Sequence, residues 1–118
     1  MTPPTITIEV VRLSVDVAEV LIRAAFAADP GSATELRGRL MGPRCPGTST
    51  IEIAYPVRPL PSAEPTIRTA RVIIPEPNLW TEKKPLTYWG PVEVWQDDAL
   101  VWSQSVEVGL RGKTKAPG

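Results

Sequence analysis

The stretch that decides the fold is Ile74–Arg111, IPEPNLWTEKKPLTYWGPVEVWQDDALVWSQSVEVGLR. Its first part, residues 75–85, contains three prolines and predicts a corner that neither helix nor strand can continue through. Two segments with apolar and polar residues in alternation follow, at 86–96 and 100–110. Their period of two predicts a long β-hairpin that closes the chain.

The loop of this hairpin, residues 97–99, sets the pairing register. A three-residue loop places Val94 opposite Trp102 and Tyr88 opposite Val108, which keeps the apolar faces of both strands together. A two-residue turn would mix apolar and polar faces, so we expect the longer loop. The face predicted to be buried consists of Tyr88, Gly90, Val92 and Val94 on one strand and Leu100, Trp102, Gln104, Val106, Val108 and Leu110 on the other.

The opposite face of the hairpin carries two tryptophans, Trp89 and Trp95, among polar residues. Two indoles on a nominally solvent-facing surface form an apolar patch, and such patches often mark a contact with another molecule. Three interpretations are open: a neighbouring loop covers the indoles, another protein or subunit binds them, or they stack on carbohydrate. We prefer an interaction surface of Trp89 and Trp95 with Glu93 and Arg111 as its polar rim.

The rest of the chain predicts further strands, at 5–13, 35–41, 49–57 and 66–74. Segment 15–28 is ambiguous, because its alanines favour a helix whereas its alternation and its strand neighbours favour a strand, which we prefer. About seven strands in one chain of 118 residues predict an all-β, immunoglobulin-like antiparallel β-sandwich. We expect the sandwich to span residues 5–111, with disordered ends at 1–4 and 112–118.

Composition excludes several functions. The chain has no histidine and one cysteine, Cys45, so neither a Ser-His-Asp triad nor a Cys/His zinc site can form within it. We expect no enzymatic activity, no metal and no cofactor. Thirteen basic and thirteen acidic residues cancel, which argues against a nucleic-acid partner. With no apolar run near 18 residues and no visible secretory signal, we expect no membrane partner and a cytoplasmic location.

The segment Ile74–Arg111 also resembles the end of the immunoglobulin-like sandwich domain of glycoside hydrolase family 2, the group of β-galactosidases, β-mannosidases and β-glucuronidases. The counterparts here are Pro77, Leu79-Trp80, Glu82, Pro85, Leu86 and Tyr88, followed by Gly109-Leu110-Arg111. The chain departs from the family pattern where Thr87 separates Leu86 from Tyr88, where two lysines follow Glu82, and where Leu110 replaces an aromatic residue.

The resemblance implies structural roles for this segment, because the family's catalytic glutamates lie in a barrel domain that follows it. Trp80 is expected to plug the end of the sandwich, Pro85 to fix the corner, and Tyr88 to bond its hydroxyl to nearby backbone. Trp102 is expected in the core from its alternation. The chain stops where the barrel would begin, so we expect a non-catalytic protein-interaction or scaffold module that binds a protein partner or forms a homodimer. A carbohydrate-binding accessory module with a glycan partner is the alternative.

Overall fold

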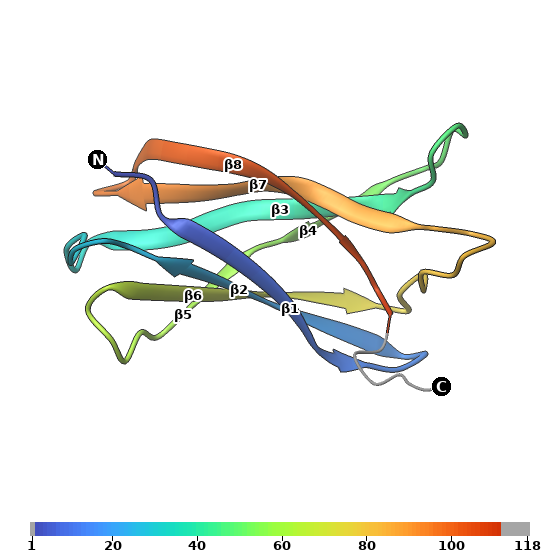
Figure 1. Ribbon diagram of the computed structural model, residues 1–118, viewed down its shortest axis with the longest axis horizontal. Coiled ribbons are helices and arrows are strands. Elements are labelled where there is room, and N and C mark those ends of the chain that lie inside the picture. The colour runs from blue at the N-terminus through green and yellow to red at the C-terminus, as the bar shows by residue number, and fades with distance from the viewer. Residues whose placement is uncertain (1, 112–118) are drawn as a thin grey trace.

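The computed structural model describes residues 2–111 and consists of two four-stranded antiparallel sheets packed face to face (Figure 1). The strands are β1 (Thr5–Leu13), β2 (Val17–Ala25), β3 (Thr34–Arg44), β4 (Ile53–Pro56), β5 (Arg58–Leu60), β6 (Ile67–Pro75), β7 (Thr87–Gln96) and β8 (Ala99–Gly109). The sheet orders β1-β2-β6-β5 and β4-β3-β7-β8 correspond to strands A-B-E-D and C′-C-F-G of immunoglobulin domains. The predicted all-β, immunoglobulin-like sandwich is confirmed.

The two ends of the chain differ in what the structure describes. Residues 2–4 precede β1 without regular secondary structure, and Pro4 is buried. Residue 1 and the segment 112–118, which we expect to be a disordered tail, lie outside the described residues.

The ambiguous segment 15–28 forms a strand, β2, as preferred. β2 lies between β1 and β6, and its alternate residues Ala18, Val20, Ile22 and Ala24 are fully buried. The helix alternative is wrong, because pairing with two neighbouring strands and burial of one face outweigh the modest helix propensity of alanine.

The predicted single strand at 49–57 is wrong, and this difference raises the count from seven strands to eight. The chain forms two short strands here, β4 in one sheet and β5 in the other, with Val57 between them. Val57 is buried, and its amide donates a hydrogen bond to the Gly38 carbonyl oxygen at 2.9 Å. Pro56 and Pro59 lie on the edge strands, where a missing amide hydrogen is tolerated.

The final hairpin has the predicted register but a different loop. Val94 pairs with Trp102 and Tyr88 with Val108, as expected. The turn has two residues, Asp97 and Asp98, whose φ angles of 51° and 61° are those of a tight hairpin turn.

A bulge restores the register that a two-residue turn alone would disturb. Val101 has no partner on β7, and the residue before it, Leu100, pairs with Trp95 on the outer face. Leu100 is 51% exposed, so its expected place in the core is wrong. One extra residue in a strand moves the residues that precede it to the opposite face of the sheet.

The centre of the β4-β3-β7-β8 sheet depends on two glycines. A Cβ atom at Gly90 would lie 2.0 Å from the Arg39 carbonyl oxygen, and one at Gly38 would lie 2.0 Å from the Pro91 carbonyl oxygen. Gly38 also has a φ of 129°, which residues with a side chain rarely adopt. The close approach of β3 and β7 therefore requires glycine at both positions. This pairing positions the outward-facing side chains of the two strands.

Candidate functional site

The outer face of β3 and β7 carries the two tryptophans, and we call it the tryptophan face. Trp89 and Trp95 lie on β7 with outward orientation, opposite Met41 and Glu35 of β3. They are six positions apart, which is about 20 Å along a strand. Both residues are partly buried, so the indoles are neither fully exposed nor enclosed in the core.

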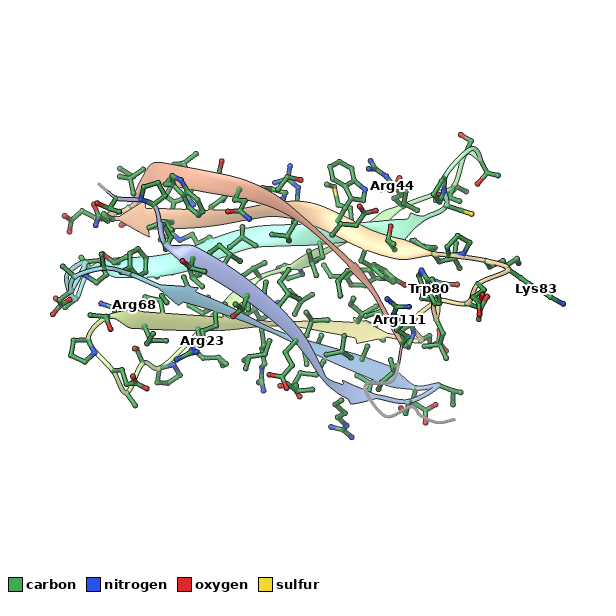
Figure 2. All side chains as sticks on the ribbon, in the orientation of Figure 1. Arg23, Arg44, Arg68, Trp80, Lys83 and Arg111 are labelled. Atoms are coloured by element: carbon green, nitrogen blue, oxygen red, sulfur yellow. The ribbon has the colours of Figure 1, made fainter. Side chains whose placement is uncertain are left out.

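Trp89 is held by an arginine and a glutamate. Its indole Nε1 donates a hydrogen bond to Glu52 Oε1 at 2.6 Å, and the Arg44 guanidinium carbon lies 3.7 Å from the ring centroid. Arg44 Nε in turn lies 3.8 Å from Glu52 Oε2. Arg44 is the last residue of β3, where the chain leaves the sheet (Figure 2). The cation over the ring and the carboxylate at its edge fix the orientation of the indole.

Trp95 has the same arrangement from different residues. Its Nε1 donates to Glu93 Oε1 at 2.9 Å, and the Arg37 guanidinium carbon lies 4.6 Å from the ring centroid. Arg37 also donates to Asp98 Oδ1 at 2.7 Å and to Glu35. The hydrogen bonds to Glu35 and Asp98 raise the pKa of Arg37 above its usual value.

The two clusters share one design, in which an arginine stacks on the indole and a glutamate accepts its hydrogen bond. Such contacts limit the conformational freedom of each indole ring. Exposed apolar residues lie next to both clusters. Leu100, opposite Trp95, is 51% exposed, and Ile51, adjacent to Glu52, is 91% exposed.

Arg111 does not belong to this face, and its expected role in the rim is wrong. Its guanidinium carbon lies 4.2 Å from the ring centroid of Trp80, at the end of the sandwich. Figure 2 shows Arg111 and Trp80 next to each other, below Arg44 in this view. The reason is that β8 ends at Gly109, and the Leu110 carbonyl then accepts a hydrogen bond from the Trp80 amide at 3.0 Å.

The residues expected to be structural lie as follows. Tyr88 is fully buried, and its hydroxyl accepts a hydrogen bond from the Asn78 amide at 3.0 Å. Trp80 is partly buried over Gly109, where an added Cβ would lie 2.7 Å from Trp80 Cδ1. Trp102 is partly buried against the core, and Pro85 is partly buried in the loop before β7.

Sequence reasoning named one residue that holds a tryptophan, Glu93, and missed the other three. Arg37 and Arg44 come from β3, and Glu52 comes from the loop before β4. Alternation in 35–41 does indicate that Arg37 points outward, but no local pattern links it to a tryptophan almost sixty positions later. The partner of an outward side chain depends on strand order, which the sequence pattern does not reveal.

A surface groove of about 530 Å³ lies at the opposite end of the sandwich from Trp80, beside Arg68 (Figure 2). Arg68 donates hydrogen bonds to the carbonyl oxygens of Thr34, Gly31, Pro65 and Ile67, and its side chain is only 12% exposed. These bonds tie two loops together and occupy the guanidinium. We therefore interpret Arg68 as structural and assign no ligand to the groove.

Comparison with models of known protein families finds no match, and comparison with curated proteins finds no similar sequence. Among residues 2–111, no three His, Cys, Asp or Glu side chains gather as a metal site requires. That same part of the chain contains no helix suited to crossing a bilayer.

Proposed function

We propose that this protein is a non-catalytic interaction module that binds a protein partner through the tryptophan face. The observation that carries this proposal is the pair of indoles, each stacked on an arginine and bonded to a glutamate. Tryptophan and arginine are the residues most enriched among those that dominate binding energy at protein interfaces. The resemblance to glycoside hydrolase family 2 is in keeping with this role, because the family's sandwich domain carries no catalytic residue.

The charges around the indoles suggest what kind of partner would fit. Arg37 and Arg44 lie beside Glu35, Glu52 and Glu93, so both signs alternate over short distances. A surface of this kind suits a partner with mixed charge and an apolar centre, and it offers no broad basic area for a phosphate backbone. A nucleic-acid or membrane partner forms no part of the proposal, and a cytoplasmic location is kept as an expectation.

The contacts favour a protein over a glycan. A sugar ring stacks on a bare aromatic face, but Arg44 covers one face of Trp89 at 3.7 Å. The hydrogen-bond donors of both indoles are also taken by Glu52 and Glu93. A protein can instead pack against the partly exposed indoles and against Leu100 and Ile51.

The test is affinity purification with the immobilised wild type and with a Trp89→Ser/Trp95→Ser double variant. The control is Ile73→Ser, which removes an apolar side chain that is 40% exposed on the other sheet. We expect specific proteins bound by the wild type and the control to be lost from the double variant, with thermal unfolding showing that all three are folded. An unchanged set of bound proteins would contradict the proposal, and hits on a glycan array would favour the carbohydrate alternative.

A further inference from the structure

The four edge strands of the sandwich differ in how they are protected against pairing with another chain. β4 and β5 have four and three residues and contain Pro56 and Pro59. β1 follows Pro3 and Pro4 and has a bulge at Val11. Short length, prolines and bulges are the devices that natural sheets use to prevent edge-to-edge association.

The fourth edge, β8, has little protection of this kind. It is eleven residues long, contains no proline or lysine, and carries one charged residue, Glu107. From Trp102 to Gly109 it pairs with β7 without interruption, and it pairs with no other described strand. A long, regular and weakly charged edge is a template for strand addition.

The side of the sandwich next to β8 is also incompletely covered. Figure 1 looks onto this side, with β1 and β8 nearest the viewer. The inward-facing apolar residues of these two strands are only partly buried, whereas Ala18, Val20, Ile22 and Ala24 of β2 and Ala70, Val72 and Ile74 of β6 are fully buried. The partly buried set comprises Ile6, Ile8, Val10 and Leu13 on β1 and Trp102, Val106 and Val108 on β8.

We propose that a second copy of this chain pairs antiparallel with β8 across a two-fold axis at Gln104. The pairing joins the β4-β3-β7-β8 sheets of two copies into one continuous sheet. In this register Trp102 lies opposite Val106 of the second copy and Ser103 lies opposite its Ser105. Val101 lies opposite Glu107 of the second copy, so no two like charges meet.

The pattern of β8 favours this register and this occupant. Trp102 and Val106, which lie two positions before and two positions after Gln104, are both apolar. A two-fold axis at Gln104 therefore places apolar residues opposite apolar residues on the inward face. An axis at Ser103 would place Trp102 opposite Gln104, and an axis at Ser105 would place Val106 opposite Gln104. The chain's zero net charge adds no long-range repulsion between copies.

The proposed dimer has one consequence for binding, which rests on the proposed function. Joining two sheets at β8 places both tryptophan faces on the same extended surface. A partner with two matching segments would then bind with higher apparent affinity than either segment alone. The pairing itself uses the sheet edge, so it holds or fails independently of any partner for the tryptophans.

Crosslinking at the axis provides the first test. Across an antiparallel pair the Cα atoms lie about 4.5–5.5 Å apart, within disulfide range. Gln104→Cys, in a Cys45→Ser background, should therefore form a covalent dimer under mild oxidation. The matched control is Val15→Cys in the same background, since Val15 is 76% exposed in the turn between β1 and β2. Equal crosslinking of the two variants would overturn the proposal.

Charge at the axis provides the second test, read by sedimentation equilibrium. Wild type should dimerise. Gln104→Lys and Gln104→Glu should each raise the dissociation constant of the dimer at least tenfold, because each new charge lies opposite the same charge in the second copy. An equimolar mixture of Gln104→Lys and Gln104→Glu should form a mixed dimer. Val15→Lys should dimerise as the wild type does. Gln104 is exposed, so these variants should remain folded. A wild type that stays monomeric at millimolar concentration, or a dimer that Gln104→Lys leaves unchanged, would overturn the proposal.

Discussion

The two faces of β7 are made by alternate residues of one strand, yet different forces fix them. The inward residues Tyr88, Val92 and Val94 have no exposed surface and pack in the core. The outward residues Trp89 and Trp95 are held by ion and hydrogen-bond contacts with residues of β3, β7 and a loop. Stability should therefore depend on the inward face, and the proposed binding of a partner on the outward one.

The largest expected effect comes from Gly90, which lets the inward and outward faces form at all. Gly90→Ala would place a Cβ 2.0 Å from the Arg39 carbonyl oxygen, a backbone atom that cannot move without separating β3 from β7. We expect a loss of about 4 kcal/mol in unfolding free energy, measured by urea denaturation. Gly47→Ala is the control, because its Cβ meets nothing within 4 Å, and only its φ of 78° should cost about 1 kcal/mol. Equal losses would show that the close approach is not essential.

The second-largest expected effect is a difference in unfolding free energy between variants of Val94 and Trp95, neighbours on opposite faces of β7. Val94→Ala removes fully buried methyl groups and should cost about 2 kcal/mol, since it leaves a cavity in a closely packed core. Trp95→Ser removes a larger side chain but should cost under about 1 kcal/mol, because its contacts are partly solvated. Urea denaturation of both variants gives the comparison. If Trp95→Ser were the more destabilising change, the outward face would be part of the structural core.

A smaller effect is expected from the two hydrogen bonds that the Tyr88 hydroxyl accepts from Asn78 at the corner. Tyr88→Phe keeps the buried ring and removes the hydroxyl that accepts from the Asn78 amide at 3.0 Å. The loss should be about 1 kcal/mol, because the backbone bond contributes the usual net value of one hydrogen bond and the longer side-chain bond adds less. Asn78→Ala, measured beside it, keeps the backbone donor and removes only the side-chain bond at 3.3 Å, so it should cost less.

Sequence reasoning succeeded on the inward face because burial leaves a periodic trace. Alternation gave the register of Val94 with Trp102, and the strand neighbours of 15–28 gave β2. The loop was missed because Val101 forms a bulge, which lets a two-residue turn coexist with that register. A bulge changes which face a residue occupies without changing composition, so Leu100 could not be placed from alternation alone.

The candidate site was predictable only in part, for a related reason. The outward orientation of Trp89 and Trp95 follows from the period of two, but their partners do not. Arg44 and Glu52 reach Trp89 because β3 lies next to β7 and the chain folds back into β4. The position of Arg111 was predicted wrongly because β8 ends at Gly109, so the alternation of the strand no longer applies and Arg111 lies next to Trp80.

The smallest expected effect concerns pH and another inward aromatic, Tyr55 of β4. Tyr55 packs edge-on against Tyr88, with ring centroids 6.1 Å apart. Burial, with a smaller contribution from Tyr88, raises the pKa of Tyr55 above its usual 10.0. The folded state therefore holds this proton more tightly than the unfolded state, and that stability is present below pH 10.0 and lost as pH rises through the folded pKa. Tyr55→Phe has no such proton, so its unfolding free energy should fall less than that of wild type between about pH 8 and about pH 11. Parallel slopes for the two proteins in urea denaturation would mean that Tyr55 ionises as freely in the folded chain as in the unfolded one.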